Sequence, residues 1–329
     1  MRTSMTKVLI IGRSDVHTKR IGKILATKYR VQTIDIDQLT TEQLKVTLTC
    51  DVSLLAVLGI SDKLSEICNL TNRPIVVFSM GYDLNEIEIS QQIRETLWHC
   101  CGIVVDCYLH YELMVELGIP ESKLLLIPYG CDHQFFAKNS PNISELLTII
   151  LNRGDSLKHG NHLAIEALES LKSLDFNFVA TLIGDHFLND HYENLLKGLK
   201  KSGHVKTIKS VDQEELLKYM GENWVYLSGS LSDGTSVSLL EAMSAGLIPV
   251  VSDWKTNLEW VADDYNGLVY ENGSSESLTL ALIRLTTLTE NEKILMVARN
   301  ARIISKRADW DANSKSLLEF IRLQKGNYE

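Results

Sequence analysis

Short apolar runs alternate with amphipathic segments along the whole of this chain. Most runs are continuous and bounded by polar residues, which is typical of strands buried on both faces of a parallel sheet. The expected strands are Lys7–Ile11, Val31–Ile36, Val52–Leu58, Pro74–Phe78, Gly102–Val105, Leu124–Ile127, Leu147–Leu151, Phe178–Ile183, Lys206–Val211, Trp224–Leu227 and Leu247–Ser252. The helical patterns between and after them are Lys19–Lys28, Asp62–Leu70, Tyr108–Leu117, His162–Leu171, Asp212–Met220, Ser277–Leu285, Glu290–Lys306 and Trp310–Leu323.

This alternation predicts an α/β fold with parallel sheets and right-handed crossovers. A chain of 329 residues is too long for one typical hydrophobic core, so two domains are expected. The segment Lys138–Leu146 is polar and contains Asn139, Ser140, Pro141 and Asn142, as a linker would. The strand pattern starts again immediately after it, at Leu147.

The composition, 45% hydrophobic and 23% charged, is that of an ordinary globular protein. The chain has no run of eighteen apolar residues, and its start lacks the apolar core of a signal peptide. Six cysteines lie in the first half without metal-type CxxC pairs, so free thiols in a reducing compartment are expected. They are Cys50, Cys68, Cys100, Cys101, Cys107 and Cys131. These features favour a cytoplasmic protein.

The net charge of −9 argues against general nucleic-acid binding. Residues 2–30 are nevertheless basic, with eight cations against Asp15, which gives 8 − 1 = +7. The cations are Arg2, Lys7, Arg13, Lys19, Arg20, Lys23, Lys28 and Arg30. They are expected either to form a solvated face or to meet an anionic acceptor or the inner membrane surface.

The stretch with the clearest chemistry is 227–246, LSGSLSDGTSVSLLEAMSAG. A strand end leads into a turn of small polar residues, and an apolar helical face then begins at Val237 and closes at Gly246. Because the first N–H groups of a helix lack partners within the helix, such a loop can bind phosphate. Asp233 lies in the loop and Glu241 about a turn into the helix, so both carboxylates can face one cleft; an N-cap acid and an ordinary helix glutamate would look the same.

These residues resemble family 4 of the retaining glycosyltransferases. The segment DGTSVSLLEAMSAGLIPVVSD has that family's acid-x7-acid spacing, and WKTNLEWVADDYNGLVY is similar to its next block. In the first half, ELGIPESKLLLIPYGCDHQFF is similar to the segment at the hinge edge of the family's first domain. The resemblance implies a GT-B fold: two Rossmann-like domains facing a central cleft, with a C-terminal helix crossing back to the first domain.

On this resemblance, residues 1–140, completed by about 308–329, form the acceptor-side domain, and residues 141–307 bind the nucleotide-sugar. Arg153 and Lys158 match the family's R-x4-K segment, whose cations hold the donor diphosphate and stabilise the charge that gathers on it as the sugar bond breaks. Glu241 would hold the ribose hydroxyls, and Asp233 would lie by the sugar, where most relatives have glutamate. The phosphate would meet the helix start at Gly234, Thr235, Ser236 and Val237.

The first half departs from the family at one position. Many relatives read H-G-x-D where this chain has Met80-Gly81-Tyr82-Asp83, so a catalytic histidine is in doubt there. Gly81 and Asp83, with Gly12 and Arg13 after the first strand, are the acceptor-side candidates, and Asp83 is favoured as a helix cap over an acceptor contact.

Other motifs are discounted. Gly12 begins no GxGxxG fingerprint. The D-x-D of Asp35 and Asp37 lies at a strand end, and the remaining motifs belong to a metal-independent group. His186 and His191 lie near Asp185 and Asp190 without a tight metal-ligand pattern, so no metal and no cofactor are expected.

The resulting prediction is a retaining, metal-independent glycosyltransferase of the hexosyltransferase type. It would move a sugar from a nucleotide-diphospho-sugar to a glycan or lipid-linked acceptor, as in polysaccharide biosynthesis. A nucleotide-sugar epimerase of the same architecture and a non-catalytic nucleotide-sugar-binding partner subunit are the alternatives. The absence of a clear cleft histidine weighs against the epimerase, and the presence of Arg153, Lys158, Asp233 and Glu241 weighs against the non-catalytic subunit.

Overall fold

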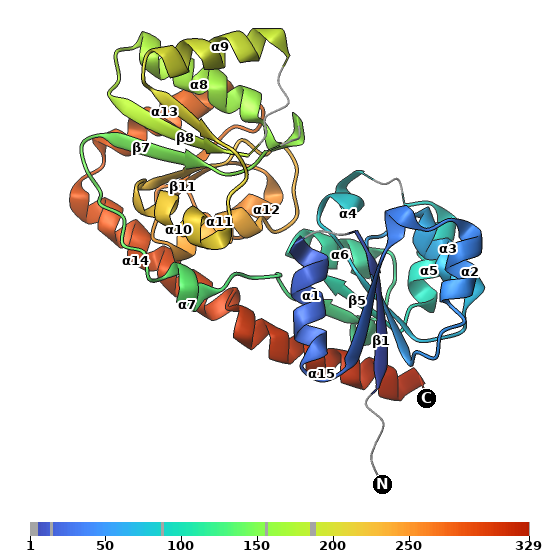
Figure 1. Cartoon of the computed structure of the whole chain (residues 1–329). Helices are drawn as coiled ribbons and strands as arrows, with labels where there is room; N and C mark the ends of the chain where they lie inside the picture. The colour runs from blue at the N-terminus through green and yellow to red at the C-terminus, as the bar shows by residue number, and fades with distance from the viewer. Residues whose placement is uncertain (1–5, 14–15, 87–88, 155–156, 185–188, 329) are drawn as a thin grey trace. The chain divides into compact units, whose positions relative to one another are not determined.

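The computed structural model describes residues 6–13, 16–86, 89–154, 157–184 and 189–328. The chain forms two compact units (Figure 1), and each has its own parallel sheet and its own hydrophobic core. Unit 1 comprises Met1–Tyr129 and Asp311–Glu329, and unit 2 comprises Gly130–Trp310. The boundary at Tyr129 and Gly130 precedes the polar segment Lys138–Leu146.

Unit 1 is built on a six-stranded sheet in the order β2-β1-β3-β4-β5-β6, with every neighbouring pair parallel. The strands are β1 (Lys7–Gly12), β2 (Arg30–Asp35), β3 (Leu54–Leu58), β4 (Ile75–Phe78), β5 (Gly102–Val105) and β6 (Leu124–Leu126). All residues of β3, β4 and β5 are buried, because helices cover both faces of a sheet of this kind.

The helices of unit 1 follow the strands in alternation. They are α1 (Val16–Ala26), α2 (Thr41–Thr47), α3 (Asp62–Leu70), α4 (Tyr82–Glu86), α5 (Gln91–His99), α6 (Tyr108–Glu116) and α15 (Trp310–Tyr328). The last helix of the chain packs on this unit (Figure 1): the Gln324 amide donates to the carbonyl of Ser122 at 2.7 Å. A methyl group added to Gly102 would lie only 2.9 Å from the Phe320 ring, so glycine lets β5 approach α15 closely.

Unit 2 repeats the pattern with a six-stranded parallel sheet in the order β12-β11-β10-β7-β8-β9. Its strands are β7 (Leu147–Leu151), β8 (Phe178–Ile183), β9 (Val205–Ile208), β10 (Val225–Leu227), β11 (Ile248–Ser252) and β12 (Leu268–Tyr270). Its helices are α7 (His133–Phe136), α8 (Asn161–Ser173), α9 (Asp190–Lys201), α10 (Gln213–Gly221), α11 (Val237–Ser244), α12 (Lys255–Leu258), α13 (Ser275–Thr287) and α14 (Glu290–Arg307).

The predicted α/β class with two Rossmann-like halves is confirmed. Six of the helices that the structure describes were not predicted. Three of them, α4, α7 and α12, have at most five residues each. The other three, α2, α5 and α9, present few apolar residues to the core; in α9 only Leu199 is fully buried. None of the helices in the described ranges is long and apolar enough to cross a membrane.

Candidate donor-binding site

Two glycines bring together the loops that follow β7 and β10. Gly160 has φ +61°, and a methyl group on it would lie 1.8 Å from the carbonyl oxygen of Gly229. A methyl group on Gly229 would in turn lie 2.4 Å from the carbonyl oxygen of Gly160. The Leu231 N–H donates to the carbonyl of Lys158 at 2.8 Å across the same junction. Only glycine allows this backbone contact, which sets the segment containing Arg153 beside the segment containing Asp233.

Arg153 is the centre of the polar contacts in these loops. Its Nη1 group forms an ion pair with Asp233 and donates to the Ser236 hydroxyl at 2.7 Å. Its backbone carbonyl accepts from the Asn161 amide at 2.8 Å. Burial alone would lower the pKa of Arg153, but the Asp233 carboxylate and the Tyr226 hydroxyl raise it overall. The guanidinium is therefore a fixed positive charge in a partly buried setting.

Asp233 is held through its main chain as well as its carboxylate. The carbonyl of Asp233 accepts from the Trp254 indole at 2.9 Å and from the Thr256 hydroxyl at 3.1 Å. Its Oδ1 accepts from the Gly234 N–H at 3.0 Å. The loop before α11 is consequently tied to the segment that opens α12, which limits how far Asp233 can move.

The start of α11 is a helix N-terminus with a polar cap. Ser236 is the N-cap residue, and its hydroxyl accepts from the Leu239 N–H at 3.4 Å as well as from Arg153. Thr235 and Ser236 are buried, whereas Val237 is half-buried. Glu241 lies one turn into the helix and is 7% exposed. The positive end of the α11 dipole and the Arg153 guanidinium thus lie together, which is an arrangement that favours an anion.

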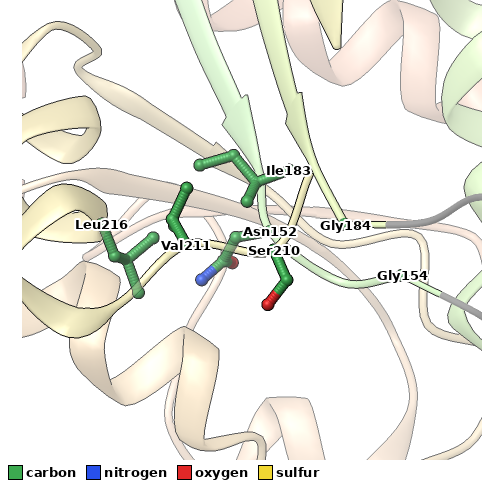
Figure 2. Close-up of a pocket in the computed structure, with 7 residues that line it drawn as sticks. All are labelled: Asn152, Gly154, Ile183, Gly184, Ser210, Val211 and Leu216. Atoms are coloured by element: carbon green, nitrogen blue, oxygen red, sulfur yellow. The ribbon is translucent and has the colours of Figure 1, made fainter. Parts of the chain in front are cut away.

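A cavity of about 300 Å³ adjoins this site at the carboxyl ends of β7, β8 and β9. Figure 2 shows the side chains of Asn152 and Ser210 in the middle of the cavity lining, with Val211 and Leu216 to the left and the backbone at Gly154 and Gly184 to the right. Its remaining lining residue is Ile183. Asn152 and Gly154 flank Arg153 in the chain, so the cavity and the Arg153 site share one loop. A volume of this size lies at the lower end of small-molecule sites.

The sequence predicted part of this arrangement. It predicts Arg153, Asp233 and Ser236 as site residues, and the structure brings these three together. Lys158 lies in the same loop, exposed, and its backbone carbonyl accepts from Leu231. Gly234 is buried between Asp233 and Thr235. Asn152, Ser210 and Leu216 were missed, although the rule that ligands bind at the carboxyl ends of parallel strands could have found them.

The acceptor-side candidates lie in unit 1. Gly12 ends β1, where a methyl group would come within 3.0 Å of Leu58, and Arg13 is exposed and pairs with Asp37 at 3.2 Å. Gly81 has φ +79°, which favours glycine.

Asp83 is 7% exposed, and its Oδ2 accepts from the backbone N–H groups of Ile60 at 2.8 Å and Met80 at 3.0 Å. Burial raises the pKa of Asp83 to about 6, despite these two hydrogen bonds. Asp83 lies in the first turn of α4 and not at its N-cap, and the N–H it accepts from belongs to Met80, three residues earlier, so this is not the N-cap contact that the sequence favours.

A buried polar network adjoins Asp83. The Nδ1 of His110 lies 3.1 Å from Asp106, and its Nε2 lies 3.1 Å from the Asn85 amide oxygen. Within the described part of the chain, Asp106, Cys107 and His110 are the group whose ligand atoms cluster closely enough to hold a metal ion. Both ring nitrogens of His110 are already engaged, so the cluster reads as a structural network. The discounted Asp185 and His186 lie outside the described residues.

One family model matches this chain. The family described as "Glycosyl transferases group 1" matches residues 133–303, just over half of the chain. The chain is 24% identical over 257 residues to the amylovoran biosynthesis glycosyltransferase AmsK of Erwinia amylovora, covering 74% of this chain and 63% of that protein.

Two solved structures are similar over nearly their whole length. The chain matches a glycosyltransferase from Rickettsia africae with a TM-score of 0.75 and 12% identity, covering 98% of this chain and 99% of that one. It matches HepE of Anabaena, solved in complex with UDP and glucose, with a TM-score of 0.75 and 15% identity, covering 96% and 99%. The two-unit architecture is therefore the GT-B fold.

Proposed function

Because this chain belongs to the glycosyl transferases of group 1, we propose that it transfers a sugar from a nucleotide-diphospho-sugar to an acceptor hydroxyl. The observation that supports the proposal is that a cavity, a partly buried arginine and a helix N-terminus lie together in unit 2. The cavity suits a nucleoside, and the Arg153 guanidinium with the first N–H groups of α11 suits the diphosphate next to it. Glu241 and Asp233 supply carboxylates for the ribose and sugar hydroxyls.

The chemistry of this step is the departure of a nucleoside diphosphate. Negative charge grows on its phosphate oxygens as the glycosidic bond breaks, and fixed positive groups stabilise that charge. Arg153 and the α11 N-terminus would do so from two sides, and Lys158 is a second cation in the loop that holds Arg153. These groups supply the charge that a divalent cation would otherwise contribute, so we propose that transfer is metal-independent. Retention of the anomeric configuration is the stereochemical expectation for this family.

In the structure, the carboxylate of Asp233 forms an ion pair with the Nη1 group of Arg153. A bound diphosphate would compete with the carboxylate for the same guanidinium, so donor binding would redirect part of this ion pair. Released from Arg153, the carboxylate could accept hydrogen bonds from the sugar hydroxyls. In this proposal Arg153 then binds the diphosphate and Asp233 binds the sugar.

UDP is the first nucleotide to test, because HepE was solved with UDP and glucose. A hexose is the sugar expected from the sequence. The similarity to AmsK suggests polysaccharide biosynthesis, and therefore a glycan or lipid-linked acceptor. Unit 1 would bind this acceptor at the carboxyl ends of its strands, near Gly12, Gly81 and Asp83.

Unit 1 could also meet an anionic membrane surface. Lys19 and Lys23 are exposed on α1, and Lys28 and Arg30 are exposed beyond it; Arg2 lies outside the described residues. Each basic residue near such a surface contributes about 1 kcal/mol of binding free energy. The protein should sediment with phosphatidylglycerol vesicles and not with phosphatidylcholine vesicles. Reversing the charge of Lys19 and Lys23 should release it, and equal sedimentation of both proteins would contradict the proposal.

The donor site is tested by a thermal-shift panel of UDP, GDP, ADP and their common sugar conjugates. A nucleotide at a hundred times its Kd should add about 2.7 kcal/mol to the free energy of unfolding. Arg153→Ala should lose this response, whereas Arg302→Ala, which removes an exposed arginine of α14, should keep it. If no nucleotide shifts the melting temperature of the wild type, the proposed function fails.

The reaction itself is tested with the donor that the panel identifies. NMR of the product should show the anomeric configuration of the donor retained, and EDTA should leave the rate unchanged. Reversible isomerisation of the free donor would instead indicate an epimerase, and binding without turnover would indicate a partner subunit.

A further inference from the structure

His159 is a residue of the Arg153 loop that the proposed function does not yet use. It lies in the short 3-10 turn Leu157–His159, between β7 and α8. Its Nε2 lies 3.0 Å from the Nη2 of Arg153, and its Nδ1 lies 2.5 Å from the carbonyl oxygen of Gly154. The imidazole therefore bridges the arginine side chain and the backbone next to that same arginine.

The contacts of His159 with Arg153 and with Gly154 indicate its tautomer. A guanidinium can only donate hydrogen bonds, so Nε2 must be the acceptor. A carbonyl oxygen can only accept, so Nδ1 must carry the proton. The ring is consequently oriented with Nε2, as the acceptor atom, toward Arg153.

The backbone of His159 is held as tightly as its ring. It immediately precedes Gly160, and a methyl group on Gly229 would lie only 3.0 Å from the His159 carbonyl oxygen. The close contact of Gly160 with Gly229 thus leaves this turn little freedom to shift. The position of the imidazole relative to Arg153 is set by the fold.

Resting on the proposed function, we infer that His159 is a positioning residue that orients the Arg153 guanidinium for the donor diphosphate. The two ends of the guanidinium have separate supports: Asp233 and Ser236 engage Nη1, and His159 engages Nη2. When the diphosphate competes for Nη1, the bond from Nη2 to His159 keeps the plane of the guanidinium in place. Without it, donor binding would have to order the arginine side chain, which costs affinity.

The inference predicts that replacing His159 lowers the affinity for the nucleoside diphosphate and leaves the affinity for the nucleoside unchanged. His159→Leu removes the acceptor and should weaken UDP binding about tenfold, the value of one hydrogen bond to a charged group. Uridine, which has no phosphate, should bind the variant and the wild type equally. His159→Gln should restore most of the UDP affinity, because the amide oxygen can accept from Nη2. His162→Leu is the matched control, since that ring packs on Tyr192 and not on Arg153.

The experiment is isothermal titration of UDP and uridine into each variant, or of the diphosphate and nucleoside of whichever base the panel identifies. In the Arg153→Ala background, His159→Leu should have no further effect on the diphosphate affinity. Unchanged UDP binding by His159→Leu would overturn the inference, as would an equal loss for UDP and uridine or no recovery with glutamine. In each case nucleotide binding by the wild type would leave the proposed function standing. If the wild type binds none of the nucleotides, both fail.

Discussion

Asp83 shows how burial sets the chemistry of a single residue. Its Oδ2 accepts two backbone N–H groups, while its Oδ1 is buried with no hydrogen-bond partner among the described residues. Removing a charged carboxylate from water is costly, so the folded protein favours the protonated form. The pKa of Asp83 rises from 3.8 to about 6, chiefly because of this burial.

This pKa shift predicts a pH-dependent stability with a definite sign. Between about pH 4 and 6 the folded protein keeps a proton on Asp83 that the unfolded chain has released, so the free energy of unfolding falls as pH rises. The shift of about 2 units, from 6 − 3.8, corresponds to at most about 3 kcal/mol. Asp83→Asn keeps an oxygen for both N–H groups and cannot ionise. It should therefore become more stable than the wild type as pH rises to about 6, and stay so above it.

Urea unfolding at steps from pH 4 to 8 measures the difference between the two proteins. The other titrating groups are common to both and cancel in that difference. Asp175→Asn is the control, because Asp175 is exposed and its left-handed backbone, φ +58°, suits asparagine equally. If the curves of wild type and Asp83→Asn run parallel, burial does not hold the proton on Asp83.

At the residue scale, the sequence predicts a site residue only where that residue belongs to a motif with a recognisable spacing. Arg153, Asp233 and Glu241 lie within motifs whose spacing matches a family, so the sequence predicts all three, and the structure brings Arg153 and Asp233 together. His159 and Asn152 lie beside those motifs without a pattern of their own. The proposed role of His159 depends on a backbone contact between Gly160 and Gly229, residues far apart in the chain, and no local pattern reports such a contact. Asn152 belongs to the site because it lines the cavity directly after β7.

At the element scale, the strands were easier to predict than the helices. β5, β7 and β8 begin and end at the predicted residues, because a strand buried on both faces is a continuous apolar run. Helices that cover a sheet on one side need few apolar positions. α9 has the sequence DHYENLLKGLKK, and Leu199 is its fully buried residue. Because most of its residues are polar, the apolar periodicity that indicates a helix is weak in this segment.

Two glycines show that the effect of a glycine-to-alanine substitution on stability depends on the element in which the glycine lies. Gly198 lies in the exposed part of α9, and a methyl group there would meet no atom within 4 Å. Gly198→Ala should therefore stabilise the protein by about 0.5–1 kcal/mol, since glycine loses more backbone entropy in a helix. Gly160→Ala should destabilise it and abolish nucleotide binding, because the methyl group would overlap the Gly229 carbonyl. Thermal unfolding of both variants is the measurement, and equal shifts would contradict the argument.

At the scale of the whole molecule, the chain forms two units because it has separate hydrophobic cores. Unit 1 has its core around β1, β3, β4 and β5, and unit 2 has cores on the two faces of its own sheet. The helix α15 returns the chain to unit 1, as the family resemblance implied. The sequence could not give the boundary at Tyr129, because the polar segment that looks like a linker packs on unit 2: the Asn139 amide donates to the Ala245 carbonyl at 2.8 Å.

Because the two units have separate cores, we predict that a bound nucleotide slows hydrogen exchange in unit 2 and not in unit 1. UDP alone should slow hydrogen exchange in peptides that contain Arg153, Ser210 and the 233–241 segment, because ligand binding suppresses local opening around its contacts. Peptides of unit 1, such as those covering Gly102–Val105, should exchange at unchanged rates. Arg153→Ala at the same UDP concentration should remove the protection around α11. Protection in unit 1 without protection around α11 would place the nucleotide elsewhere, since the phosphate-binding groups proposed here all lie in unit 2.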